Sequence, residues 1–182
     1  MITVTRPYLP DRKKLDAYID GIYQRAHLTN GGPLLNELTN RLREYLGVEH
    51  LLLVANGTLA LQLAYAVLGV KGHNSKAITT PFSFAATSNS LSWEGIHPVF
   101  ADIDDQSFCL SADAIAAAMQ PEIKAIVPVH VYGNACDVDA IERIAAQHNI
   151  KTIYDGAHAF GVTLRGKSLL SYGDAATLSL HA

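Results

Sequence analysis

Short apolar runs alternate with segments of helical spacing along most of this chain. The runs occupy residues 77–80, 97–101, 124–129 and 150–155, and a helical pattern separates each run from the next. Neighbouring parallel strands need a long crossover between them, which is usually a helix. The alternation therefore predicts an α/β fold with a mainly parallel sheet that helices cover on both faces.

The other predicted elements extend this pattern toward both ends of the chain. Helical spacing covers residues 13–25, 34–46, 59–68 and 84–93, and two further helices begin at Ser111 and Asp137. Gly47 is placed to end the helix before it. The remaining predicted elements are a short strand at 51–54, a hairpin near 162–169 and a last strand at 175–180. We expect residues 1–30 to form an N-terminal arm with the first helix, and residues 31–182 to form one larger domain.

Composition and charge exclude several classes of protein. The 182 residues are 49% hydrophobic and 17% charged, which is typical of a folded globular domain. A formal net charge of −3 gives no broad basic surface, so we expect no nucleic-acid partner. No apolar run approaches the roughly 20 residues of a membrane-spanning helix. The N-terminus also lacks a secretion signal, so we expect a cytoplasmic protein without a membrane partner.

Common catalytic and metal-binding motifs are also missing from the sequence. The eight histidines show no HxH or HExxH spacing, so no metal site is expected. Cys109 and Cys136 form no CxxC pair and are interpreted as small buried residues. There is no GxGxxG after the first predicted strand, no P-loop and no GxSxG. These absences argue against a dinucleotide fold, a P-loop nucleotide site and a serine hydrolase.

A carboxylate stands at the end of the predicted strand 150–155. Asp155 follows Ile153 and Tyr154, and His158 comes three residues later. In an open α/β sheet, ligands bind beyond the carboxyl ends of the strands. Asp155 is therefore either a cap or structural ion-pair partner, or the group that holds a bound cation. His158 is either a structural histidine or a second group of the same site.

Two more groups with binding chemistry follow predicted strands. Asn56-Gly57-Thr58 precedes a helix, where free backbone N–H groups and the helix dipole attract phosphate, although the same residues also suit an ordinary helix cap. Phe84 follows the next strand, where its ring either packs in the core or stacks on a planar cofactor. A phosphate site, an aromatic ring, Asp155 and a serine at the last strand are together what an aromatic phosphate cofactor would need.

Six ordered blocks of the chain resemble the DegT/DnrJ/EryC1/StrS sugar aminotransferases, which are pyridoxal-phosphate enzymes of the aspartate-aminotransferase fold, type I. The resemblance covers nearly the whole chain. The blocks are Asn-Gly-Thr-Leu-Ala-Leu (56–61), Thr-Pro-Phe-Ser-Phe-Ala-Ala-Thr (80–87), Pro-Val-Phe-Ala-Asp-Ile-Asp (98–104), Val-His-Val-Tyr-Gly (129–133), Tyr-Asp-Gly-Ala-His-Ala-Phe-Gly (154–161) and Ser-Leu-His-Ala (179–182).

The resemblance implies that pyridoxal 5′-phosphate is the cofactor. Asp155 would pair with the ring nitrogen and keep it protonated, because a cationic ring is the better electron sink. His158 would lie near the ring hydroxyl. Six residues match the family's cofactor-binding motifs, three at the phosphate and three at the ring: Gly57, Thr58, Ser179, Phe84, Asp155 and His158.

The same resemblance implies an activity and partners. The family transfers an amino group, here expected from glutamate, to a keto carbon of a nucleotide-linked deoxysugar. Residues 134–139 look most similar to the branch that forms dTDP-4-amino-4,6-dideoxyglucose, so dTDP-4-dehydro-6-deoxyglucose is the expected substrate. A homodimer is implied, and the loop Thr29-Asn30-Gly31 is either a plain turn or part of a site shared between subunits.

The family's Schiff-base lysine follows the last of these blocks, which places it just after Ala182 and leaves the catalytic residue unassigned within this chain. Lys124, Lys151 and Lys167 stand in other motifs. We therefore expect a large domain truncated before the C-terminal domain and inactive by itself. Three alternatives stay open: a sugar 3-dehydratase with histidine at the lysine position, a non-catalytic relative that binds cofactor or sugar, and a fragment that binds nothing.

Overall fold

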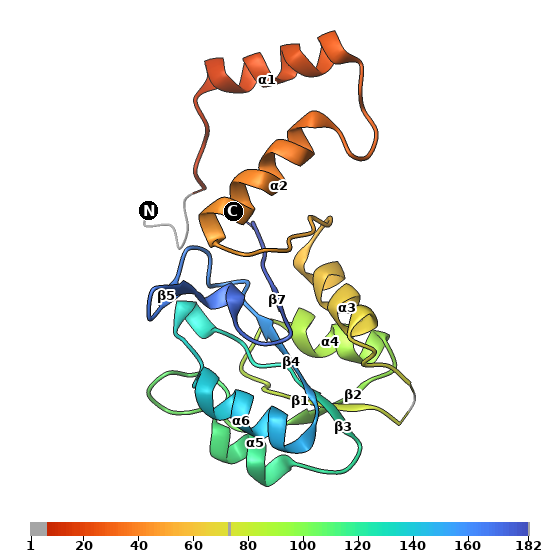
Figure 1. Cartoon of the computed structure of the whole chain (residues 1–182), viewed down its shortest axis with the longest axis vertical. Helices are drawn as coiled ribbons and strands as arrows, with labels where there is room; N and C mark the ends of the chain where they lie inside the picture. The colour runs from red at the N-terminus through yellow and green to blue at the C-terminus, as the bar shows by residue number, and fades with distance from the viewer. Residues whose placement is uncertain (1–6, 73, 182) are drawn as a thin grey trace, which may run out of the picture.

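A computed structural model describes residues 7–72 and 74–181, and its centre is a five-stranded parallel sheet (Figure 1). All four neighbouring pairs are parallel, and the strand order is β2-β1-β3-β4-β7. The strands are β1 (Lys76–Thr79), β2 (His97–Phe100), β3 (Ile123–Ile126), β4 (Lys151–Asp155) and β7 (Ala175–Thr177). The predicted mainly parallel α/β sheet is confirmed.

Helices cover both faces of the sheet, each over its own apolar cluster (Figure 1). Ile153 and Tyr154 are neighbours on β4 and point to opposite faces, so each belongs to a different cluster. Leu61 and Leu91 pack on the Ile153 side, from α3 and α4. The helices are α3 (Gly57–Val67) and α4 (Ala85–Trp93) on one face, and α5 (Ala112–Ala118) and α6 (Val138–His148) on the other.

The two N-terminal helices lie at one end of the molecule, beyond the sheet (Figure 1). They are α1 (Arg12–Arg25) and α2 (Pro33–Leu46). Helix α2 buries Leu42 and Leu46, whereas α1 buries no residue. No helix in the described parts of the chain is long and apolar enough to cross a membrane.

Local side-chain chemistry explains where several helices begin and end. Ser111 accepts a hydrogen bond from the Ala114 amide and Asp137 accepts one from the Ala140 amide, which satisfies amides that a helix leaves free at its start. Gly47 ends α2 in the left-handed region, at φ 62°. The predicted starts at Ser111 and Asp137 and the predicted stop at Gly47 are all confirmed.

The predicted strand at residues 51–54 is wrong, because the structure has no strand there. A strand exists only where a neighbour pairs with its backbone, and β7, the nearest edge of the sheet, pairs with β4 alone among the described residues. The last strand is also shorter than predicted. It ends at Thr177 because its partner strand β4 ends at Asp155, the residue opposite.

The hairpin predicted near residues 162–169 is present as two short antiparallel strands, β5 (Thr163–Leu164) and β6 (Lys167–Ser168). Two 3-10 turns, η1 (Val131–Gly133) and η2 (Leu169–Ser171), complete the elements. Cys109 and Cys136 are free thiols and buried, as expected of small core residues. Residues 1–6 of the predicted arm and Ala182 of the last block lie outside the described residues.

Candidate functional site

Apart from Gly57 and Thr58, the predicted site residues follow strands of the parallel sheet, so they lie toward its carboxyl edge. Asp155 ends β4, and Ser179 lies two residues beyond β7. Phe84 caps α4, the helix that follows β1. Gly57 is the first residue of α3, which packs over the same end of β7.

Asp155 is a buried carboxylate with two hydrogen-bond donors from the protein. Asp155 is only 7% exposed. Oδ2 accepts from Thr87 Oγ1 at 2.7 Å, and Oδ1 accepts from the Ala157 amide at 3.1 Å. None of the ion pairs among the described residues involves Asp155. A buried carboxylate without a cation partner is costly, and each oxygen keeps acceptor capacity for a bound cation.

Thr87 is a residue of this site that the sequence analysis did not select. Its hydroxyl is fully buried and contacts both Asp155 and Ser83, whose Oγ lies 2.6 Å from Thr87 Oγ1. A hydroxyl carries one proton, and an ionised carboxylate only accepts. Thr87 therefore donates to Asp155, and Ser83 donates to Thr87. The only hint in the sequence was the place of Thr87 in the block 80–87.

The start of α3 presents backbone donors. The Asn56 side chain accepts from the Leu59 amide at 2.9 Å, and the Asn56 carbonyl accepts from the Ala60 amide at 3.1 Å. The amides of Gly57 and Thr58 have no such acceptor among residues 7–72 and 74–181. Backbone amides that lack an acceptor at the first turn of a helix attract an anion. The helix-cap interpretation of Asn56 is correct, and it leaves the neighbouring amides available.

Ser179 lies directly against Gly57. A Cβ built on Gly57 would stand 3.5 Å from Ser179 Cβ and 3.8 Å from Ser179 Oγ. The structure therefore brings a hydroxyl from the end of β7 next to the first amides of α3. Gly57 and Ser179 are two of the three residues expected at the phosphate. The third, Thr58, follows Gly57 in the same turn of α3.

His158 is held by Tyr132 from the loop after β3. The two rings stack with centroids 5.8 Å apart and planes 6° apart, and the Tyr132 amide donates to His158 Nδ1 at 3.2 Å. Because Nδ1 accepts, the neutral ring must carry its proton on Nε2. Tyr132 reaches this position with a left-handed backbone, at φ 53°. His158, an exposed residue, thus offers the Nε2–H as a donor.

Phe84 is exposed, not part of the core. It is 77% exposed at the start of α4, which contradicts the alternative of core packing. Its neighbour Phe82 instead stacks on Phe108, with ring centroids 5.9 Å apart. The Phe84 ring is therefore available to a ligand, and the described residues give it no stacking partner of its own.

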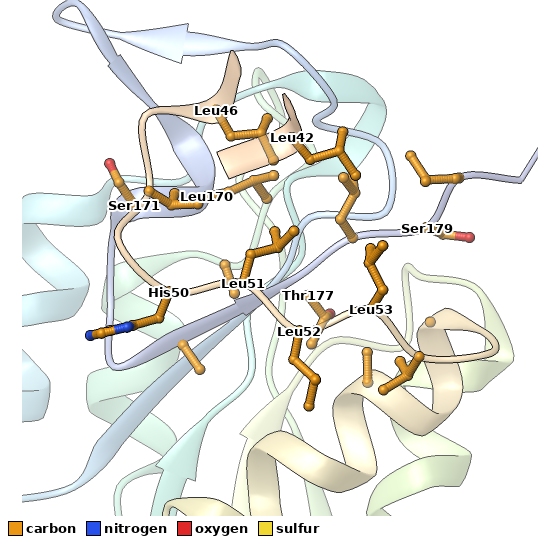
Figure 2. A pocket seen from close by; sticks show the side chains of 18 of the residues that line it. Leu42, Leu46, His50, Leu51, Leu52, Leu53, Leu170, Ser171, Thr177 and Ser179 are labelled. Atoms are coloured by element: carbon orange, nitrogen blue, oxygen red, sulfur yellow. The ribbon is translucent and has the colours of Figure 1, made fainter. Parts of the chain in front are cut away.

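A large cavity lies beside this cluster and overlaps it only in part. It has a volume of about 710 Å³ and runs between the C-terminal end of α2, residues 48–55 and β7 (Figure 2). Leu42 and Leu46 of α2 and Leu51 and Leu53 point toward one another in it, whereas Leu52 points the other way (Figure 2). Gly57 and Ser179 line this cavity, whereas Asp155, Phe84 and His158 do not. We place the candidate site at the polar cluster, because that is where a buried carboxylate and free amides stand.

A parallel sheet with a buried aspartate and helix-start amides at its carboxyl edge is the arrangement that ligand-binding α/β proteins use. Comparison with known sequences narrows the class further. Residues 10–182 match the DegT/DnrJ/EryC1/StrS aminotransferase family, and the chain belongs to that family. The resemblance found in the six sequence blocks is confirmed.

Three known proteins illustrate the relationship. The chain is 48% identical over 181 residues to a dTDP-4-amino-4,6-dideoxy-D-glucose transaminase of Shigella dysenteriae, and the match covers 100% of the chain and 48% of that protein. The crystal structure of DesI with its TDP-sugar product has a TM-score of 0.91 and 37% identity, with 97% of this chain and 44% of that one covered. NtdA of Bacillus subtilis, solved with bound cofactor PMP, has a TM-score of 0.81 and 28% identity, with 98% and 41% covered. The chain therefore spans about half the length of the relatives it matches.

Proposed function

We propose that this chain is the cofactor-binding part of a pyridoxal-phosphate aminotransferase that acts on a nucleotide-linked keto-deoxysugar. The observation that carries the proposal is Asp155, a buried carboxylate with two protein donors and no cation partner among the described residues. The Shigella relative and DesI support a dTDP-linked sugar, and dTDP-4-dehydro-6-deoxyglucose is our proposed substrate. Glutamate is the proposed amino donor.

The residues present fit pyridoxal phosphate. A ring that carries both a basic nitrogen and a phosphate needs an anion on one side and anion-binding donors on the other. Asp155 supplies the first, and the α3 amides with Ser179 supply the second. Because Gly57 has no side chain, the nearest atoms around that position are the Ser179 side chain and the Leu178 carbonyl oxygen, at ordinary contact distances, so a phosphate oxygen can approach the backbone closely.

Each residue would then have a distinct task. Asp155 would accept the ring N–H and hold that proton in place, and when bound the cofactor supplies an electron sink for the charge left by loss of the substrate Cα proton. Gly57, Thr58 and Ser179 would bind the phosphate through amides and hydroxyls at the positive end of the helix dipole. His158 would donate from Nε2 to the ring hydroxyl. Phe84 would cover one ring face.

We further propose that the 182-residue chain is inactive by itself. Lys151 is the lysine of the central strand, but it begins β4, whereas Asp155 ends it. At about 3.3 Å per residue these two positions lie about 13 Å apart along the strand. Lys151 also pairs with Asp174 at 2.7 Å. This geometry argues against Lys151 as the Schiff-base lysine, in keeping with the family motif, which places that lysine after the block 179–182.

The domain division and the homodimer remain proposals as well. Residues 31–182 would be an incomplete large domain, which is supported by the length of the relatives and by the apolar cavity along β7. Residues 1–30 would form an arm that meets a second subunit. Tyr18 and Ile19 on α1 are 46% and 38% exposed, which is typical of a helix that packs against a second subunit.

The expected cytoplasmic location stays a prediction.

The test uses the longer protein that carries this segment. Purified with pyridoxal phosphate, it should convert dTDP-4-dehydro-6-deoxyglucose and glutamate to the amino sugar and 2-oxoglutarate, measured by mass spectrometry. D155A should abolish turnover and weaken cofactor retention. Loss of a sugar hydroxyl without gain of nitrogen would favour the dehydratase alternative, and unchanged turnover in D155A would contradict the proposal.

A further inference from the structure

We propose that Thr87 is a positioning residue for Asp155, and that the hydroxyl pair Ser83–Thr87 sets the direction in which that carboxylate faces a bound ring. The inference rests on the proposed function, because the ring in question is the pyridine of pyridoxal phosphate. It deepens that function by adding two residues that would act through Asp155 without touching the cofactor.

The direction of the hydrogen bonds follows from the groups involved. Thr87 Oγ1 lies 2.7 Å from Asp155 Oδ2 and 2.6 Å from Ser83 Oγ, so its proton goes to the carboxylate and the Ser83 proton comes to it. A hydroxyl that receives one hydrogen bond donates the next one more strongly. Oδ2 is thereby fixed from one side, and its other lone pair remains for a ligand.

A second series of buried hydrogen bonds holds the backbone at Thr87. Ser90 Oγ donates to the Thr87 carbonyl at 3.1 Å, and Tyr65 OH lies 3.2 Å from Ser90 Oγ. Burial raises the pKa of Tyr65 well above its ordinary value, so this hydroxyl keeps its proton at all working pH values. Thr87, Ser90 and Tyr65 are each 0% exposed. Water therefore has no access from this side to replace a missing donor.

Asp155 has its other donor on the opposite oxygen. The Ala157 amide binds Oδ1 from two residues further along the same loop. One donor on each oxygen fixes the plane of the carboxylate, whereas the loop donor alone leaves it free to swing about that single contact. The rotation that Thr87 prevents is the one that would carry Oδ2 away from a ring nitrogen.

Thr79 provides a matched control for the loss of a buried threonine hydroxyl. It is also 0% exposed, and its Oγ1 donates to the Val127 carbonyl at 2.8 Å. No hydrogen bond among the described residues joins Thr79 to Asp155. The substitutions T87V and T79V therefore remove the same group from equally buried sites, and only the first removes a donor to the carboxylate.

The probe is pyridoxamine 5′-phosphate, which needs no lysine to bind. In the 182-residue chain, T87V should weaken the binding of this probe about 10- to 100-fold, as expected for a lost hydrogen bond to a charged group. T87V should also lower the pH at which the ring nitrogen of the bound probe loses its proton, followed by ¹⁵N NMR. T87S keeps the hydroxyl and should restore both readouts, while T79V should lower the melting temperature without changing either.

Equal affinity and equal ring titration in T87V and T79V would overturn the proposal. If the wild-type chain fails to bind the probe, the proposed function fails for this chain, and a cofactor-free readout decides the role of Thr87. That readout is the denaturation midpoint of T87V, D155A and the double variant. A non-additive result confirms that Thr87 acts on Asp155, and additive losses would refute it.

Discussion

Gly57 and Ser179 meet where the first turn of α3 passes the end of β7, with an ideal Gly57 Cβ only 3.5 Å from Ser179 Cβ. The two residues are more than a hundred positions apart in the sequence. Their contact places a hydroxyl beside backbone amides that have no acceptor among the described residues. An anion that bound to the amides and the hydroxyl together would link α3 to the end of β7. The affinity for such an anion therefore tests whether Gly57 and Ser179 form one binding site.

The substitution S179A should weaken phosphate binding specifically. A hydroxyl that donates to a charged oxygen contributes about 1.5–3 kcal/mol, so affinity for pyridoxamine 5′-phosphate should fall by at least about tenfold. Calorimetric titration with this probe and with pyridoxamine, which lacks the phosphate, separates the effects. Equal loss for both compounds would show that Ser179 does not contact the phosphate.

The substitution G156A should destabilise the fold. A Cβ at Gly156 would collide with the Leu170 side chain and stand 3.0 Å from the Thr177 carbonyl oxygen, where β7 pairs with β4. Overpacking of this kind costs about 1–3 kcal/mol, visible as a lower midpoint in urea. G57A is the control, because its added Cβ meets only ordinary contacts. A G156A midpoint equal to that of wild type would mean that the loop after β4 moves easily.

Stability should fall as the pH drops from neutral toward 4, because of His130. This ring is 0% exposed and stacks on Tyr154 at 4.7 Å, and burial lowers the pKa of His130 to about 4. The Leu169 backbone carbonyl opposes part of that effect. The unfolded chain takes up the proton near its ordinary pKa of about 6.5, so the stability contribution is complete above that pH and is lost as the pH falls through the folded pKa.

The loss across this window amounts to about 3 kcal/mol if the pKa difference is realised in full. Urea midpoints measured from pH 7.5 down to about 4 should show this slope. H130Q keeps an acceptor for the Cys136 amide, which now donates to His130 Nδ1, and should flatten the slope. A wild-type slope unchanged by H130Q would assign the pH dependence to other groups.

The His158 ring should be found as the Nε2–H tautomer. The Tyr132 amide donates to Nδ1 at 3.2 Å, and ¹⁵N NMR of the neutral ring distinguishes the two tautomers. Y132G keeps the amide and suits the φ of 53°, so it should preserve the tautomer although the ring stack is lost. A protonated Nδ1 in the wild-type chain would rule out His158 as an Nε2 donor toward a ring hydroxyl.

The sheet could be predicted because its strands are buried and their apolar runs end in turn residues. Residues 51–54 show the limit of that signal, since they are as apolar as a strand but have no neighbour to pair with. Pairing depends on what lies beside a segment in space, which its own sequence does not contain. The same dependence shortened β7, whose ladder ends opposite Asp155.

The sequence predicted only part of the candidate site, again because contacts in space are not written in a local pattern. Asp155 could be selected because it ends a buried strand, where parallel sheets bind ligands. Thr87 could not, because α4 is rich in serine, threonine and alanine and no spacing marks one hydroxyl as buried. Only the packing of α4 against the end of β4 gives Thr87 its contact with Asp155. Groups that act through a neighbour leave the weakest trace in a sequence.

The central claim is that Asp155 holds a protonated ring nitrogen. The most direct measurement is the ¹⁵N signal of ring-labelled pyridoxamine 5′-phosphate bound to the wild-type chain and to D155N, recorded across pH. The account predicts a nitrogen that stays protonated to clearly higher pH in the wild type than in D155N, where the amide is neutral. The same titration of the ring nitrogen in both proteins would contradict it.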